Sequence, residues 1–211
     1  MGRRQQGPIS VLVEGEINAG QLTDRVIHAD DAGVKVILGS SPGGNAVLAW
    51  GGKDSAGAYG VGAVQAMVRL AGKDWQPAET IFPGTILFDI RSLVINDDGV
   101  AAIAMAQSVI PGPCETANWR AYMPGSGWAP ATVVTRCNVP ISEYVRDPTV
   151  VMTPTGTFVA AWRETSLVSL DTGVAAARSR VFTSTLGTSL VWSAATEIAI
   201  AVFRRADAGP H

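Results

Sequence analysis

The chain has 211 residues, of which 47% are apolar and 16% charged, with 16 Lys and Arg against 18 Asp and Glu. A disordered chain needs low hydrophobicity and high charge, and binding to nucleic acid or to an anionic membrane needs a basic patch, so this composition fits neither. The 23 glycines and 12 prolines favour a turn-rich β protein, and no apolar stretch approaches the roughly 20 residues of a membrane-spanning helix.

Short apolar and β-branched runs between clusters of Gly, Pro, Asn and Asp predict β-strands along the chain. Two strands are expected first, at 9–13 and 20–27. Three groups of four strands follow, at 34–38, 45–50, 61–70 and 75–82, at 92–95, 100–107, 116–123 and 128–135, and at 149–152, 157–163, 174–182 and 190–198. A final apolar strand is expected at 199–204. No segment predicts a convincing helix, so the expected fold class is all-β.

Two sequence markers recur in the same order in the three groups, which indicates an internal repeat. The first is a Gly-led apolar run: Gly44-Asn-Ala-Val-Leu-Ala-Trp50 aligns with 99–105 and with 156–162, and the glycines are 55 and 57 residues apart. The second is a tryptophan that opens the fourth strand, with copies at Trp75, Trp128 and Trp192. The apolar runs are nearly continuous, as expected for strands covered on both faces.

This layout resembles bacterial β-propeller repeats, in which a Gly-containing turn, an apolar strand and a Trp-led strand recur in each blade. The resemblance covers about residues 34–204 and implies a small β-propeller of about four blades, built from repeats of about 55 residues. The layout is also distantly similar to sialidase-type blades. The sialidase Asp-box Ser-x-Asp-x-Gly-x-Thr-Trp is absent, however, and Asn96-Asp-Asp-Gly99 is its nearest approach. No catalytic residue is therefore carried over.

We expect a single all-β domain over residues 1–211, with a partial unit at 9–28, repeats at about 34–82, 92–135 and 148–198, and a closing strand at 199–204. A terminal strand that pairs with a blade begun at the other terminus would close a ring and remove free sheet edges. Two alternatives stay open. Three-odd blades could assemble with copies of themselves, or two antiparallel sheets could stack in a β-sandwich or jelly roll.

The expected function is that of a non-enzymatic binding or structural module that presents loops for a carbohydrate or protein ligand. The matched variable loops are 51–59, 108–115 and 166–173. One alternative is a structural component of a larger, self-associating assembly such as a phage virion or tail. Another is a glycoside hydrolase or lyase, which needs two carboxylates about 5–9 Å apart in one pocket. Because the acidic residues fall mostly in turns, an enzyme is the weaker hypothesis.

The candidate ligand-binding residues are Trp119, Arg120, Tyr122 and Tyr59. Trp119 has no counterpart in the other repeats, and aromatic faces beside a guanidinium suit carbohydrate or peptide ligands. The alternative role of Trp119 is packing beneath the loop at 111–114. No nucleic-acid partner and no membrane insertion are expected. No signal peptide is expected either, because no long apolar run follows the basic N-terminal residues.

No cofactor and no metal site are expected, because the chain has no Cys-x-x-Cys and no clustered histidines. Cys114 and Cys137 could form a disulfide only if their Cα atoms come within about 7 Å, and two spare thiols are the alternative. The acidic pairs 30–31 and 97–98 could share a proton or hold Ca²⁺. Asp beside Gly more simply favours a turn, since its side chain bonds the local backbone. His28 as the base of a Ser-His-Asp triad is not favoured.

Overall fold

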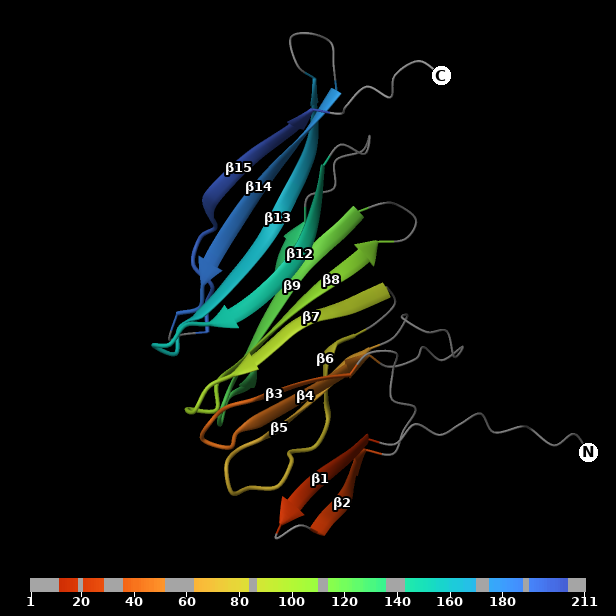
Figure 1. Ribbon diagram of the computed structural model, residues 1–211, viewed down its shortest axis with the longest axis vertical. Coiled ribbons are helices and arrows are strands. Elements are labelled where there is room, and N and C mark those ends of the chain that lie inside the picture. The colour runs from red at the N-terminus through yellow and green to blue at the C-terminus, as the bar shows by residue number, and fades with distance from the viewer. Residues whose placement is uncertain are drawn as a thin grey trace, which may run out of the picture.

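The computed structural model describes residues 12–18, 21–28, 36–51, 63–83, 87–109, 114–135, 143–169, 175–187 and 190–204. Their regular structure is β-strand throughout, so the prediction of an all-β fold is confirmed (Figure 1). The strands form one hairpin and three larger antiparallel sheets. In this described part of the chain, no helix is long and apolar enough to cross a membrane.

Each of the three larger sheets takes its strands in chain order. The first sheet contains β3 (Val36–Ser40), β4 (Ala46–Gly51), β5 (Val64–Arg69) and β6 (Glu79–Phe82). The second contains β7 (Leu87–Ile95), β8 (Ala101–Val109) and β9 (Cys114–Met123), with β10 (Gly127–Trp128) and β11 (Thr132–Thr135) both paired to β9. The third contains β12 (Glu143–Met152), β13 (Phe158–Ser169), β14 (Ala175–Thr185) and β15 (Thr196–Arg204). The hairpin joins β1 (Leu12–Asn18) to β2 (Gln21–His28).

The two sequence markers occupy equivalent places in the three sheets. The amide of Gly44 donates to the carbonyl oxygen three residues earlier at 3.0 Å, and Gly99 and Gly156 donate in the same way at 3.0 and 2.9 Å. All three have φ between 79° and 89°, where a residue without Cβ is favoured. The amide that follows each marker tryptophan donates to the carbonyl oxygen eight residues earlier, at 2.9 Å after Trp75 and at 2.8 Å after Trp128 and Trp192.

The second strands of the first two sheets, β4 and β8, pack on both of their faces, and the sheets stack face to face (Figure 1). Between the first and second sheets, Val47 and Ala49 of β4 pack in one core with Ala101, Ile103 and Met105 of β8. Between the second and third sheets, Ala102 and Ala104 of β8 pack in another core with Phe158, Ala160 and Trp162 of β13. A buried aliphatic side chain contributes about 1.5–3 kcal/mol, so these two cores hold the stack together.

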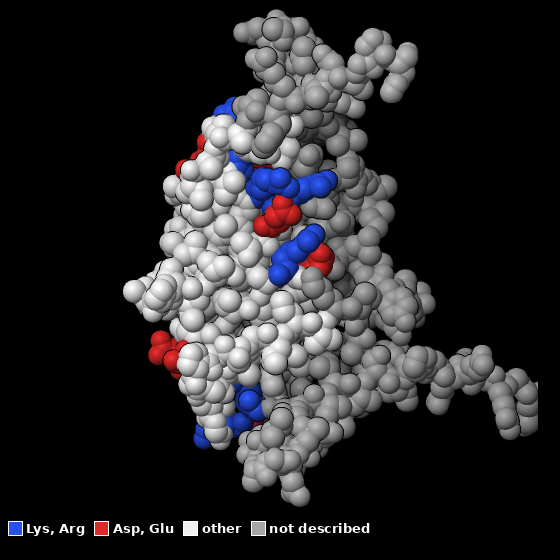
Figure 2. Space-filling model, viewed as in Figure 1, with Lys and Arg blue, Asp and Glu red and all other residues white. Residues whose placement is uncertain are grey.

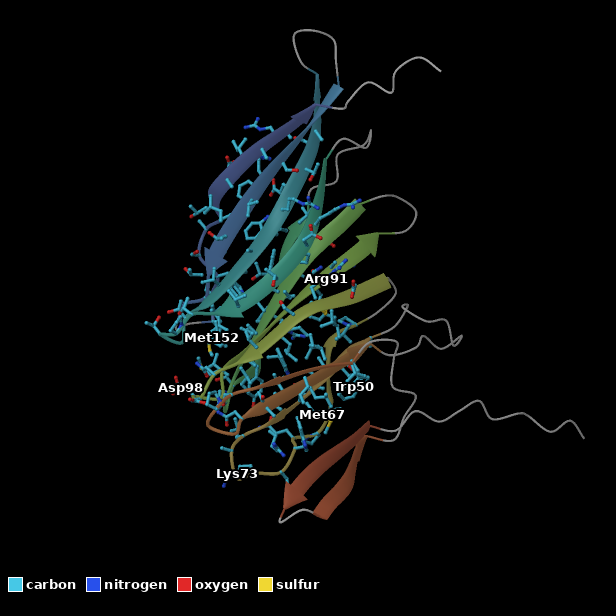
Figure 3. All side chains as sticks on the ribbon, in the orientation of Figure 1. Trp50, Met67, Lys73, Arg91, Asp98 and Met152 are labelled. Atoms are coloured by element: carbon cyan, nitrogen blue, oxygen red, sulfur yellow. The ribbon has the colours of Figure 1, made fainter. Side chains whose placement is uncertain are left out.

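We call the side of each sheet that meets the preceding sheet its back face, and the side that meets the following sheet its forward face. On every second strand, the side chains two, four and six residues after the turn glycine form the back face. Those three and five residues after it form the forward face. On the back face of the first sheet, Leu48, Trp50 and Met67 are 2–6% exposed and form a third cluster with Trp75. Trp50 and Met67 lie on the side of the first sheet toward the β1–β2 hairpin (Figure 3).

The end of the chain differs from the expected strands. The expected fourth strand at 190–198 and closing strand at 199–204 are replaced by one strand, β15, which pairs with β14 over Ala176–Thr183. Residues 190–195 instead form the connection before it, which contains the bridge between Leu186 and Trp192. Trp192 therefore precedes its strand, as Trp75 precedes β6. In the described residues β15 does not pair with the hairpin, so closure of a ring stays a prediction.

Candidate functional site

The turns that join the first two strands of each sheet lie at one edge of the stack, and side chains join the first of them to the second. Asn45 Nδ2 donates to the carbonyl oxygens of Asn96 at 3.0 Å and Asp97 at 2.9 Å, while its Oδ1 accepts from the amide of Ala71 at 2.8 Å. Asp97 Oδ1 accepts from the amide of Gly43 at 2.6 Å. We call this set of contacts the first junction.

The close approach at the first junction depends on Gly43 and on the charge of Asp97. A Cβ atom at position 43 would lie 2.7 Å from Asp97 Oδ1, so a larger residue would push the carboxylate away. The nearby Ser41 hydroxyl and the amide of Gly43 both lower the pKa of Asp97. Hydrogen bonds to the charged form stabilise it, so Asp97 stays an ionised acceptor at neutral pH.

The equivalent edge between the second and third sheets is open, and we call it the second junction. The aligned turns give the residues that occupy equivalent positions. At the second junction, Val100 replaces Asn45 and Pro154 replaces Asp97. Asp98 replaces Gly43. The valine side chain has no polar group, and neither valine nor proline offers a side-chain acceptor for the facing amide. A cavity of about 320 Å³ remains there, lined by Asn96, Asp98, Val100, Met123, Thr155, Gly156, Thr157, Phe158, Leu186, Gly187 and Leu190.

The cavity at the second junction has an aliphatic floor and a polar rim. Leu186 is 9% exposed, and Val100, Met123 and Leu190 are partly buried around it. Asp98 and Thr155 at the rim are exposed, and Asp98 lies on the same edge of the stack as Met152 (Figure 3). The volume falls at the small end of the range of about 300–1,000 Å³ for ligand pockets. Leu190 has a φ of 59°, an unusual conformation for a leucine and one that is enriched at binding sites.

Two of the predicted binding residues, Trp119 and Tyr122, lie in different cores. Trp119 is 2% exposed between the second and third sheets, where its ring centroid is 4.9 Å from that of Trp162 and its Nε1 donates to Thr149 O at 3.3 Å. Tyr122 is 2% exposed between the first and second sheets, and its hydroxyl donates to Gln76 Oε1 at 3.0 Å. Both side chains are therefore core residues, and they do not share a surface.

Arg120 lies on the same face as Tyr122 and joins the first two sheets. Its guanidinium donates to the carbonyl oxygens of Ala129 and Ile81 and lies 5.8 Å from the ring centre of Phe82. Burial lowers the pKa of Arg120, and the negative charge of Glu79 opposes that shift. The structure thus gives Arg120 a role within the stack rather than beside Trp119.

Several other candidate residues fall outside the described part of the chain. Tyr59, Cys137 and the acidic pair at 30–31 are among them, so the predictions about these residues stay predictions. Cys114 begins β9, and the proposed disulfide with Cys137 likewise stays a prediction. The pair at 97–98 lies in a turn: Asp97 makes the contacts of the first junction, and Asp98 lines the cavity at the second.

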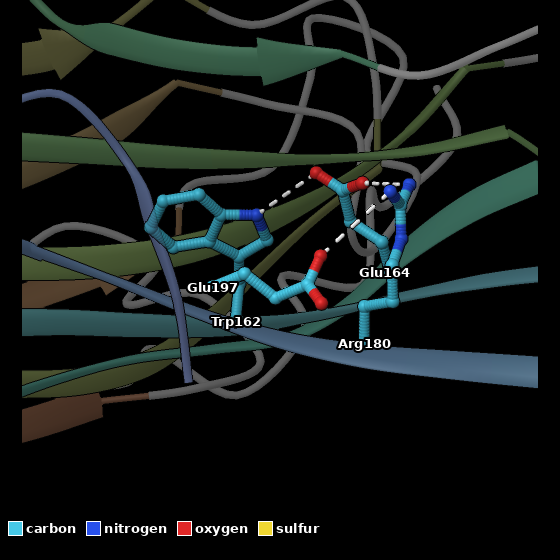
Figure 4. Close-up of polar contacts among 4 residues, drawn as sticks. All are labelled: Trp162, Glu164, Arg180 and Glu197. Atoms are coloured by element: carbon cyan, nitrogen blue, oxygen red, sulfur yellow. Dashed lines mark hydrogen bonds and ion pairs between the residues drawn. The ribbon is translucent and has the colours of Figure 1, made fainter. Parts of the chain in front are cut away.

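A partly buried ionic cluster lies on the back face of the third sheet (Figure 4). Glu164 is 5% exposed and accepts from Trp162 Nε1 at 3.3 Å and from Arg180 Nη2 at 3.0 Å. Glu197 lies 3.9 Å from the other terminal nitrogen of Arg180. A guanidinium thus contacts both carboxylates, which matches a structural ion pair rather than an acid and a base facing a substrate. In the described residues, no group of three or more His, Cys, Asp or Glu side chains could hold a metal ion.

Comparison with known proteins finds no family model and no curated protein that matches the chain. The interpretation of the second junction therefore depends on its geometry. Sequence reasoning did not identify this cavity, although the sequence carries a signal for it. When the turns are aligned, the polar Asn45 and Asp97 of the first junction are replaced at the second junction by the apolar Val100 and Pro154. This difference is visible in the sequence alone.

Proposed function

We propose that the chain is a non-enzymatic binding module of β-propeller type, and that the cavity at the second junction is its ligand site. The observation that carries this proposal is the contrast between two equivalent edges. One is closed by the hydrogen bonds of Asn45 and Asp97, and the other keeps about 320 Å³ of space. The three antiparallel sheets, two of four strands and one of five, follow one another along the chain and stack face to face, which supports the propeller interpretation.

The lining of the cavity favours a protein ligand that inserts a lysine side chain. The aliphatic floor matches the methylene stem of lysine. Asp98 is the ionisable residue on the lining, and its carboxylate suits a terminal ammonium. A carbohydrate is less favoured, because the aromatic residue of the lining, Phe158, is only 3% exposed and offers no open ring for a sugar.

The proposal can be tested by titrating N-acetyl-lysine methylamide into isotope-labelled protein and following amide shifts by NMR. At about 0.3 kcal/mol per non-hydrogen atom, such a probe should bind with a dissociation constant on the order of 1 mM. We expect shifts at 96–100, at 155–158, and at the group 186, 187 and 190. The norleucine analogue, which lacks the ammonium, should bind less tightly, and Asp98→Asn should remove that difference.

The first junction supplies a matched variant that closes the second. Asp98→Gly, Val100→Asn and Pro154→Asp together copy Gly43, Asn45 and Asp97, and should fill the gap with contacts that the protein already makes elsewhere. This triple variant should stay folded and lose the shifts. The proposed site is wrong if the triple variant binds the lysine probe as the parent does, or if the shifts fall outside the three segments.

A catalytic function has less support. The buried carboxylate of Glu164 is paired with Arg180, and Asp97 is engaged by the amide of Gly43. A glycosidase needs one carboxylic acid and one carboxylate facing a common bond, and these contacts leave neither residue in that arrangement.

A further inference from the structure

The forward faces of the first two sheets are buried at their centres, whereas that of the third is open near its turn; farther along the same face, Thr165 and Ser179 are buried. Val47 and Ala49 on the first sheet are 0% exposed, and so are Ala102 and Ala104 at the same positions of the second. On the third sheet, the same positions are held by Val159 and Ala161, which are both partly exposed. Val159 and Ala161 therefore occupy positions that are buried in the other two sheets. Among the described residues, no sheet of this chain covers them.

The open face is apolar around these two residues. In the register of the third sheet, Val159 lies between Val151 and Thr185, and Ala161 lies beside Thr183. Val151 is 52% exposed. Val181 lies on the same face, opposite Arg163. We call the group of Val151, Val159, Ala161, Val181 and Thr183 the forward patch.

Two of the charges near the forward patch pair with each other. Arg163 and Asp147 form an ion pair of 2.7 Å on the same sheet. Few charged side chains appear on the described surface in Figure 2, and several of those lie close to an opposite charge. Covering the patch would therefore desolvate Arg163 and Asp147 as an ion pair, which costs less than burying either charge alone.

We infer that the forward patch of one copy packs against the β1–β2 end of a second copy. Within one chain, each forward face meets the back side of the unit that follows, and the unit that begins the stack is the β1–β2 hairpin. That hairpin lies at the opposite end of the stack from the third sheet (Figure 1), so it is placed to meet the forward patch of a neighbour. A lone two-stranded hairpin is marginal in water and gains from such cover.

This contact is head-to-tail, since the two surfaces that meet are different. Head-to-tail contacts generate a closed ring when the rotation between copies closes, and an open stack when it does not. The inference uses the packing of the sheets alone and does not depend on the ligand proposed for the second junction.

Light scattering behind size exclusion, run over a concentration series, measures the expected association. The parent chain has a mass of 22.0 kDa and should elute as multiples of that mass. Ala161→Arg and Val151→Arg each place a charge in the forward patch and should reduce the mass to 22.0 kDa while the far-UV circular dichroism stays unchanged. Val151→Arg avoids the centre of the sheet and serves if Ala161→Arg fails to fold.

The control Ala131→Arg adds the same charge at an exposed alanine outside the patch and should leave the association intact. Mixing tests the head-to-tail arrangement, because Val151→Arg keeps a normal β1–β2 end and should cap parent assemblies, lowering their mass. A monomeric parent would overturn the inference and favour a ring closed within one chain. Multimers that survive both patch variants, or that Val151→Arg does not cap, would also overturn it.

Discussion

Asn45 shows how one buried amide can hold two sheets in register. Its side chain is 4% exposed and makes three hydrogen bonds, which reach the turn of the second sheet and the connection after β5. An asparagine after a turn glycine is easily taken for a local turn residue. The structure shows instead that its bonds are long-range, and no local pattern could have indicated their partners.

Asn45→Ala should lower the free energy of unfolding by about 2–3 kcal/mol, since it removes these bonds and leaves buried groups without partners. Urea denaturation followed by tryptophan fluorescence measures the change. Thr157→Ala alters the equivalent position of the third sheet, where the side chain is exposed, and should cost less than about 0.5 kcal/mol. Equal effects of the two variants would show that the first junction contributes nothing specific.

The charge of Asp97 should make the first junction sensitive to acid. Because its pKa is lowered in the folded state, the ionised carboxylate stabilises the fold above its unfolded pKa, and that contribution is lost as the pH falls through the folded pKa. Unfolding should therefore cost more free energy in the parent than in Asp97→Asn at about pH 7, and the gap should shrink below about pH 4. A gap that stays constant across this range would rule out the charge as its source.

At the scale of strands, the apolar runs predicted β4 and β8 well, because a strand covered on both faces has no polar alternation. The start of β13 was also predicted, but the strand continues to Ser169 beyond the expected end at 163. The start of β12 was missed. Asp147 and Pro148 indicate a turn, yet β12 runs from Glu143 and passes these residues through a bulge, with Asp147 at a φ of 54°. Asp tolerates that conformation, and proline is accepted at bulges.

The position five residues after the turn glycine offers a paired test of the stacking. Ala104→Leu adds a side chain between the second and third sheets, where the alanine is 0% exposed, and should cost about 1–3 kcal/mol through overpacking. Ala161→Leu makes the same change on the forward patch and should cost less in the monomer. Thermal unfolding of both variants at low protein concentration gives the comparison, and an Ala104→Leu variant as stable as the parent would contradict the packing described here.

For the whole molecule, the spacing of the glycines predicted three equivalent units. The prediction that Trp119 and Tyr122 form one binding site overlooked that both lie on β9, three residues apart. Residues an odd number apart point to opposite faces, so these two side chains enter different cores. The cavity arises from a difference between two junctions. It can be recognised only once the turns are known to face each other.

Stacking also predicts graded stability along the molecule. Amides of β8, which lies between two packed faces, should exchange slowest with deuterium, and those of β15, an edge strand of the third sheet, should exchange faster. Hydrogen exchange read by mass spectrometry tests this order. Uniform protection across the three sheets would mean that the molecule opens only as a single cooperative unit.

The strand order within each sheet has a consequence for how the chain reaches its fold. Every ladder among the described strands joins neighbours in sequence or nearly so, while contacts between sheets, such as that of Ser92 with Val150, span 58 residues. Short loops close sooner than long ones, so a nascent chain can pair each meander as it emerges and dock it afterwards. A duplicated unit would then add one more sheet without changing the strand pairing of the existing sheets. Gene duplication is therefore an accessible route by which such a molecule can grow.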